Sequence, residues 1–268
     1  MLKKLLKYDL KSIFKLWWIA AASTVLLSCL SGIFLGPLEG TATLPFFAEV
    51  LGSLFEMLLI MSLMGFMLFS QVLVFIRYFK NFFSDEGYLT FTLPVKRSEL
   101  LNSKLISGVL TIIAADLVYV VDIFIIVAAV NPDIIKSIFE AIIESIKDLG
   151  VYFFVFAFEI LIICLLLAIF STLFMFACIT IGSVIAKRAK VMVAIGFYYG
   201  ASSFFGTAMF MFLVSLSGVD GWFNSLGNAA ENMVIALIML LIIAFLAFVS
   251  ICIYNLLYTL LDKKLNLT

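Results

Sequence analysis

The sequence MLLIMSLMGFMLFSQVLVFI, residues 57–76, carries no charged side chain, although Glu56 precedes it and Arg77 follows it. About 20 helical residues, at about 1.5 Å each, cross the roughly 30 Å hydrocarbon core of a bilayer. Because lipid offers no hydrogen-bond partner, a segment this long must satisfy its peptide groups internally, as a helix does. The stretch therefore predicts a transmembrane helix.

Similar uncharged runs recur along the chain. Its 268 residues are 65% hydrophobic and only 13% charged, with a mean hydropathy of +1.25. A soluble domain of this length has no interior large enough for such a composition, and the runs lack the alternation of outer-membrane barrel strands. We predict an all-α polytopic membrane protein with a single transmembrane domain over residues 1–268. The six expected spans lie at about 16–35, 50–76, 105–130, 151–183, 191–215 and 233–260.

The basic residues indicate an orientation for these spans. Of 17 lysines and arginines, all but Lys136 and Lys147 fall in segments that six spans would place on one side of the membrane. Cytoplasmic loops carry the excess of positive charge in membrane proteins. We therefore expect both termini and the segment 82–104 in the cytoplasm.

Two amphipathic segments flank or join the spans. Residues 1–15 are predicted to form an interfacial helix in the inner headgroup region, serving as a membrane anchor, as a docking surface for a cytoplasmic partner, or as both. Residues 131–150 predict a second interfacial helix on the outer face, with Asn131 as its N-cap, Pro132 in its first turn and Gly150 at its end. The lysines along one face of the first helix are Lys3, Lys7, Lys11 and Lys15.

The sequence lacks the residues that several kinds of catalysis require. The chain has no histidine, which excludes histidine-dependent triads and most zinc sites. It also lacks the G-x-x-x-x-G-K-[ST] loop that holds ATP phosphates. Its four cysteines fall within predicted spans, so no disulfide framework is expected. We predict no catalytic residue, no metal site and no enzymatic activity of its own.

Four acidic residues do lie inside predicted spans, without lysine or arginine at the same depth: Glu56, Asp116, Asp122 and Glu159. Such a carboxyl group is protonated, faces water or meets a cationic ligand. For Glu56 and Asp122 we favour a position near the outer headgroups. For Asp116 and Glu159 two interpretations stay open. Either they form a proton or cation path or a polar wall of a substrate cavity, or Glu159 lies near the outer headgroups and Asp116 is a protonated hydrogen-bond donor.

The fifth predicted span differs from the others in its small residues. Gly196 and Gly200 have GxxxG spacing, which Ser203 continues on the same face, and small residues so spaced let helix backbones approach closely in lipid. Packing within the chain and a subunit interface remain equally open. Tyr198 and Tyr199 add hydroxyl groups that could face a cavity.

The long polar passage FFSDEGYLTFTLPVKRSELLNSK, residues 82–104, stands between the second and third spans. Its first part predicts a short helix at about 84–92, with Asp85 and Glu86 in the first turn, where acidic side chains are favourable, and Pro94 beyond its end. A helix that lies across the inner membrane surface and joins two spans can act as a lever on them.

Residues 85–105, DEGYLTFTLPVKRSELLNSKL, resemble the loop between spans two and three of the type-2 ABC transporter permeases. The chain is particularly similar to small Gram-positive permeases whose ATPase is encoded separately, which implies the bacterial plasma membrane. The resemblance implies that residues 1–15 form the family's connecting helix and that the loop holds a coupling helix. The implied ATPase-coupling residues are Asp85, Glu86, Gly87, Tyr88, Leu89, Phe91, Pro94 and Arg97.

The same resemblance implies partners and a function. Two copies of a cytoplasmic ATPase would bind ATP and Mg, whereas this chain would bind no cofactor and no nucleic acid. A second permease chain, identical or a sister, would complete the assembly within membrane lipids. The substrate to be exported would be amphipathic: a lipid, a peptide or a drug. The substrate path or helix interface would include Asp116, Glu159, Gly196, Tyr198, Tyr199, Gly200 and Ser203.

Two other functions stay open from the residues. An ion- or proton-coupled secondary transporter could use Asp116 and Glu159, but such a carrier has no need of a rigid lever between its spans. A membrane scaffold or sensor without transport is the second. Co-purification with an ATPase would separate the permease from both.

Overall fold

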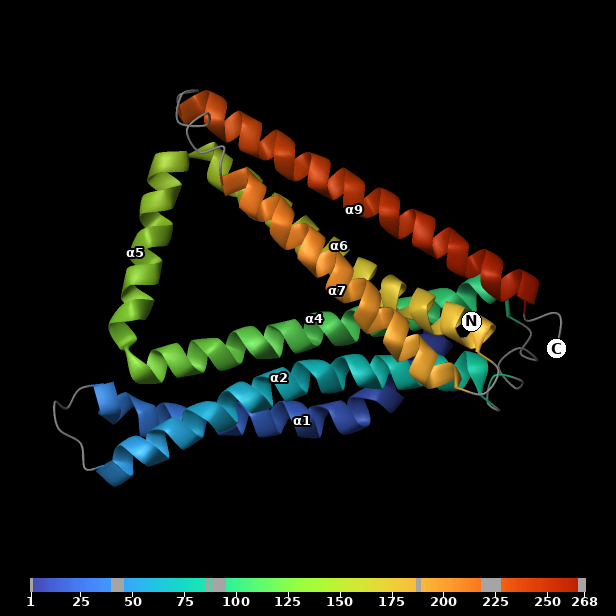
Figure 1. Cartoon of the computed structure of the whole chain (residues 1–268). Coiled ribbons are helices and arrows are strands. Elements are labelled where there is room, and N and C mark those ends of the chain that lie inside the picture. The colour runs from blue at the N-terminus through green and yellow to red at the C-terminus, as the bar shows by residue number, and fades with distance from the viewer. Residues whose placement is uncertain are drawn as a thin grey trace. The chain divides into compact units, whose positions relative to one another are not determined.

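The computed structural model describes residues 2–39, 46–84, 87, 95–186, 189–217 and 228–264. All elements in these ranges are helices, which confirms the predicted all-α class; Figure 1 shows them coloured in chain order. They are α1 (Leu2–Glu39), α2 (Phe46–Phe83), α4 (Arg97–Val130), α5 (Pro132–Leu149), α6 (Val151–Ile185), α7 (Lys190–Ser217) and α9 (Asn228–Lys264).

Five stretches of these helices are long and apolar enough to cross a membrane: Lys3–Ile33, Val50–Phe83, Arg97–Val130, Val151–Ile185 and Asn232–Asp262. They contain or overlap the predicted first, second, third, fourth and sixth spans. The predicted fifth span, 191–215, falls in α7, which is not one of the five. The chain thus has the architecture of a multi-pass helical membrane protein.

Helix α1 covers both the predicted interfacial helix and the predicted first span without a break. No glycine or proline occurs before Gly32, so nothing in the sequence interrupts the helical hydrogen bonds between them. The two segments therefore form one continuous helix.

The chain divides into two compact units, each built from two separate stretches. The first unit comprises Met1–Arg77 and Asn102–Gly150, and the second comprises Tyr78–Leu101 and Val151–Thr268. The division therefore falls inside α2 and inside α4. The sequence composition did not predict this division, because it falls within helices: α2 and α4 each contribute residues to both units.

The first unit has an aromatic centre where α1 and α2 meet. Trp17 is 1% exposed and packs with Ala21, Phe66 and Ala115. Its indole Nε1 donates a hydrogen bond to Ser70 Oγ at 3.0 Å. Buried indole N–H groups usually find such a partner, so the ring is fixed by packing and by a polar contact.

Farther along α1, small side chains allow α4 to come close. Ser28 Oγ donates to Asp122 Oδ1 at 2.9 Å. A Cβ atom added at Gly32 would lie 2.5 Å from Ala129 Cβ. Close backbone approach and interhelical polar contacts are the usual basis of helix association in lipid, and both occur here.

In the second unit, α6 contacts α7 and α9. Gly182 allows a close approach to α7, since a Cβ atom there would lie 2.7 Å from the backbone nitrogen of Ala194. The ring of Tyr78 stacks on Phe176 with a centroid separation of 3.9 Å, and its hydroxyl group meets Thr180 Oγ1 at 3.0 Å. These contacts join the end of α2 to α6.

The contact at Gly182 leads to a first prediction. We expect Gly182→Ala to destabilise the protein by about 1–3 kcal/mol, because the added methyl group meets helix backbone rather than a movable side chain. Gly196→Ala is the matched control, as no atom lies within 4 Å of the place that its new methyl group would occupy. Thermal unfolding in detergent measures both; equal melting temperatures for the two variants would contradict the close approach of α6 and α7.

Candidate functional site

Asp9 is a buried carboxylate near the start of α1. It is 3% exposed, like Ile13 at 3%, and at about 100° per residue both lie on the same face of the helix. The lysines at positions 3, 7, 11 and 15 are exposed, as the amphipathic pattern predicted. The acid therefore sits on the face of α1 that packs against the protein.

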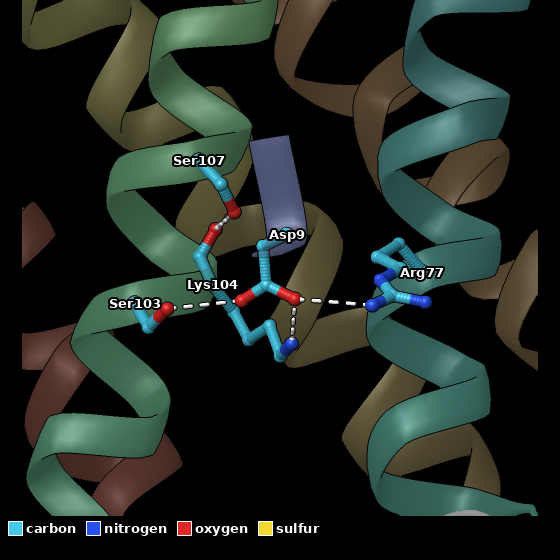
Figure 2. Close-up of polar contacts among 5 residues, drawn as sticks. All are labelled: Asp9, Arg77, Ser103, Lys104 and Ser107. Carbon is cyan, nitrogen blue, oxygen red and sulfur yellow. Dashed lines mark hydrogen bonds and ion pairs between the residues drawn. The ribbon is translucent and has the colours of Figure 1, made fainter. Parts of the chain in front are cut away.

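Three side chains from α2 and α4 surround this carboxylate (Figure 2). Lys104 Nζ contacts Asp9 Oδ1 directly, and Arg77 Nη2 lies 3.4 Å from the same oxygen. Ser103 Oγ donates to the other oxygen, Oδ2, at 2.9 Å. We call Asp9, Arg77, Ser103 and Lys104 the Asp9 clasp.

The local sequence of α4 places two of these partners together. Ser103 and Lys104 are consecutive residues and are 0% and 7% exposed, respectively. One turn later, Ser107 Oγ donates to the backbone carbonyl of Lys104 at 3.0 Å, as Figure 2 shows. A short hydroxyl side chain at both positions leaves room for the long Lys104 side chain to reach α1.

The electrostatics of the clasp make it sensitive to the loss of a partner. Two cationic groups face one carboxylate, and Lys104 is as deeply buried as Asp9, whereas the Arg77 side chain is 28% exposed. Breaking a buried ion pair commonly costs about 3–5 kcal/mol because the remaining charge has no compensation. The pair thereby links α1 to α4 within the protein interior.

The Asp9 clasp lies near the two helix ends that the polar segment 84–96 connects. Arg77 lies about two helical turns before the end of α2, and Lys104 lies about two turns after the start of α4. The polar segment 84–96 connects these two helix ends. Asp9 therefore holds α1 to both helices that carry this segment.

Little of the predicted ATPase-coupling set falls within the described residues. Asp85, Glu86, Tyr88, Leu89, Phe91 and Pro94 lie outside them, so the predicted helix at 84–92 stays a prediction. Gly87 donates its N–H to the carbonyl of Ser84 at 2.8 Å. A Cβ atom at Gly87 would lie 2.9 Å from the carbonyl oxygen of Phe82, so this tight turn requires glycine.

Arg97, the last residue of the predicted coupling set, is held by α9. Its Nη1 lies 2.6 Å from Asp262 Oδ1 and donates to the backbone carbonyl of the same residue at 3.0 Å. The start of α4 is thereby tied to the end of α9. Both partners are partly exposed, so this pair contributes less to stability than the buried clasp does.

The four intramembrane acids occupy different surroundings. Glu56 and Asp116 are exposed. Asp122 is 0% exposed and accepts a hydrogen bond from Ser28, so it joins α1 to α4; its position near the outer headgroups stays a prediction. Glu159 is 8% exposed, and its Oε2 finds no hydrogen-bond partner among the described residues. Asp116 and Glu159 belong to different units.

The small-residue face of α7 has no neighbour within the described chain. No atom lies within 4 Å of the Cβ positions built at Gly196 and Gly200, and Ser203 is exposed. Tyr199 is 54% exposed, whereas Tyr198 meets Phe174 with a centroid separation of 5.9 Å. Helix α7 thus contacts α6 through Ala194 and Tyr198, and what packs on the GxxxG face stays a prediction.

Sequence reasoning missed Asp9, although a signal was present. A carboxylate on the apolar face of an amphipathic helix is costly unless it meets a cation, and two basic residues flank the polar loop. Within the described ranges no group of three or more Cys, Asp or Glu side chains could hold a metal ion. The contacts of the clasp hold α1 to α2 and α4.

Comparison with known proteins adds no relative: no protein-family model, no curated protein and no solved structure matches this chain. The class that its own architecture defines is an all-α protein with five helices that are long and apolar enough to cross a membrane.

Proposed function

We propose that this chain is the membrane-spanning permease subunit of an ATP-binding cassette transporter that exports an amphipathic substrate. The observation that carries the proposal is the Asp9 clasp, which holds α1 to the two helices that flank the polar segment 84–96. A loop whose two stems are fixed to a third helix suits the transmission of force. The resemblance of residues 85–105 to the permease loop is the second support.

The mechanism follows from how the loop is anchored. A soluble partner that moves the segment 84–96 moves the ends of α2 and α4, and through Asp9 it also moves α1. Because buried charges fix their partners in one geometry, displacement passes to the helices instead of being lost in side-chain motion. The tight turn at Gly87 keeps the first part of the loop close to Phe82.

The proposal includes partners that this chain does not contain. Two cytoplasmic ATPase subunits supply ATP and Mg, and a second permease chain, identical or a sister, completes the transporter in the bacterial plasma membrane. Helix α7 acts as the predicted fifth span, which brings the number of spans to six: its 28 residues correspond to about 42 Å. Six spans place both termini on the cytoplasmic side with the loop.

The substrate path is proposed to use polar groups that the described chain leaves uncovered. Asp116 is exposed near the middle of α4, where a carboxyl group facing lipid alone is costly. The face of α7 that carries Gly196 and Gly200 is open and suits close approach of a second subunit. Asp116 is proposed as a polar group of the path, and the α7 face as the contact with a second permease chain.

A direct test is the dependence of ATP hydrolysis on this chain. We expect no hydrolysis by the purified chain alone, and a stable complex with stimulated hydrolysis when it is co-expressed with its ATPase. Tyr88→Ala with Phe91→Ala should weaken that complex more than thirtyfold, since losing a buried aromatic anchor commonly costs about 2 kcal/mol or more. Titration of ATPase binding to the permease in detergent measures the loss.

The control for this test is Phe154→Ala with Phe158→Ala. These two aromatic residues of α6 are 63% and 64% exposed, and they lie near the end of α6 that follows α5, far along the span from the loop. They should leave ATPase binding unchanged. Normal binding by the Tyr88 and Phe91 variant, or hydrolysis by the chain alone, would contradict the proposal.

The secondary transporter remains the rival, because Asp116 and Glu159 are carboxyl groups within spans. The two proposals differ in energy source. Uptake into vesicles distinguishes them: transport without an ATPase that stops when the proton gradient is collapsed supports the carrier. Transport that requires ATP and survives collapse of the gradient supports the permease.

A further inference from the structure

Helix α5 is strongly amphipathic: its charged and its large apolar side chains lie on opposite faces. At about 100° per residue, its charged side chains fall within an arc of about 120°, and its large apolar side chains fill the opposite half. The charged residues are Asp133, Lys136, Glu140, Glu144, Lys147 and Asp148. The large apolar residues are Ile134, Ile135, Ile138, Phe139, Ile142, Ile143, Ile146 and Leu149.

The apolar face of α5 has no protein partner in the described chain. None of its residues is buried, and Phe139 and Ile143 are 59% and 53% exposed. Ile142, near the middle of the apolar arc, is 41% exposed. A face of this size stays away from water in a stable protein, so something outside the described residues covers it.

The connections of α5 fix where it lies. Only Asn131 separates it from α4, and only Gly150 separates it from α6. Asn131 caps the helix by accepting a hydrogen bond from the Asp133 N–H at 3.1 Å, and Gly150 ends it with a φ of 54°. Because α4 and α6 are both candidate spans, α5 begins and ends where two spans leave the hydrocarbon. Its 18 residues extend about 27 Å from one to the other.

We propose that α5 lies flat in the lipid interface, with its isoleucine face in the acyl boundary and its charged face in water. The leaflet is the one opposite the segment 84–96, because α4 runs across the membrane from that segment to α5. The inference rests on the spans alone and does not depend on the proposed transport function.

The net charge of α5 indicates whether electrostatic attraction or apolar burial binds it to the membrane. Four acidic residues and two lysines give the helix a net charge of −2, so anionic headgroups do not attract it. Burial of apolar side chains in the interface supplies the binding instead. Its association should therefore be at least as strong on phosphatidylcholine as on membranes that also contain phosphatidylglycerol.

The experiment compares two faces of the same helix in vesicles. Ile142→Cys and Glu140→Cys are each labelled with an environment-sensitive fluorophore in the reconstituted full-length chain. The native cysteines lie within α1, α6 and α9, so the unmodified chain gives the labelling background. We expect nitroxide-bearing lipids to quench the label at 142 several-fold more than the label at 140, and aqueous iodide to show the reverse order. Ile146→Cys and Glu144→Cys form a second opposed pair in case one variant does not fold.

Each outcome decides the proposal. Lipid quenching confined to positions 142 and 146, in vesicles with and without phosphatidylglycerol, supports the flat interfacial helix. Equal iodide quenching of both faces shows that α5 stands in water and overturns it. Shielding of the isoleucine face from lipid and iodide alike shows that protein covers it, either a second copy or another part of the chain, and also overturns it.

Discussion

Replacement of Asp9 by leucine should lower the free energy of unfolding by about 3–5 kcal/mol, because it leaves the buried Lys104 ammonium group without its carboxylate. Arg77 is partly exposed and can reach water, so most of the cost arises at Lys104. Denaturant titration of the purified chain in detergent measures the change. The effect is large because Lys104 is 7% exposed and cannot regain hydration without moving α4.

Two further variants separate the charge effect from general damage. Asp9→Leu combined with Lys104→Met removes both buried charges and should recover most of the lost stability, as apolar replacement of a buried pair often does. Asp133→Ala removes an exposed pair with Lys136, whose side chains are 76% and 78% exposed, and should change stability little. If Asp9→Leu costs no more than Asp133→Ala, the clasp does not form.

The double variant also tests the proposed mechanism. It should remain folded but couple ATP hydrolysis to transport less tightly, because α1 is no longer fixed in register with α2 and α4. Comparison of transport per ATP hydrolysed, in vesicles, measures this coupling. Unchanged coupling in a stable double variant would mean that the clasp serves stability alone.

The second large effect is expected for Trp17→Ala, at about 3–5 kcal/mol. Trp17 is 1% exposed at the contact of α1 with α2, and its removal leaves a cavity and removes the hydrogen bond to Ser70, whose hydroxyl group still donates to the Phe66 carbonyl at 2.9 Å. In lipid, packing rather than transfer from water holds helices together, so the cavity accounts for most of the loss. Trp17→Phe, which keeps a ring but loses the hydrogen bond, should cost less.

The adjacent residue provides the control. Trp18 is 63% exposed and has the same side chain one position along the helix. Trp18→Ala should leave the thermal unfolding of the detergent-solubilised chain nearly unchanged. Equal destabilisation by the two alanine variants would contradict the packing described for α1 and α2.

The sequence predicted what depends on local signals. The length and hydropathy of 57–76 are visible in a single stretch, and so are the caps at Asn131 and Gly150, and both predictions agree with α2 and α5. The Asp9 clasp was missed because its partners are distant: Lys104 lies 95 positions along the chain. No pattern within α1 identifies which basic residue will meet its carboxylate.

The same limit applies to the small residues. GxxxG spacing singled out Gly196 and Gly200, yet a close approach of α6 and α7 occurs at Gly182 and Ala194. Spacing identifies helix faces that permit close contact, whereas the arrangement of neighbouring helices decides which of them is used. The division of α2 between two units likewise depends on contacts with residues remote in sequence.

The separation of the two halves of the Asp9 clasp has a consequence for biosynthesis. Asp9 leaves the ribosome 95 residues before Lys104, which at about 5–20 residues per second is a delay of about 5–20 s. Throughout that interval α1 carries a carboxylate on its apolar face with no cation from α4 to meet it. Insertion of α4 supplies Ser103 and Lys104 together, so the nascent chain can lock α1 in place only after its third long helix has entered the membrane.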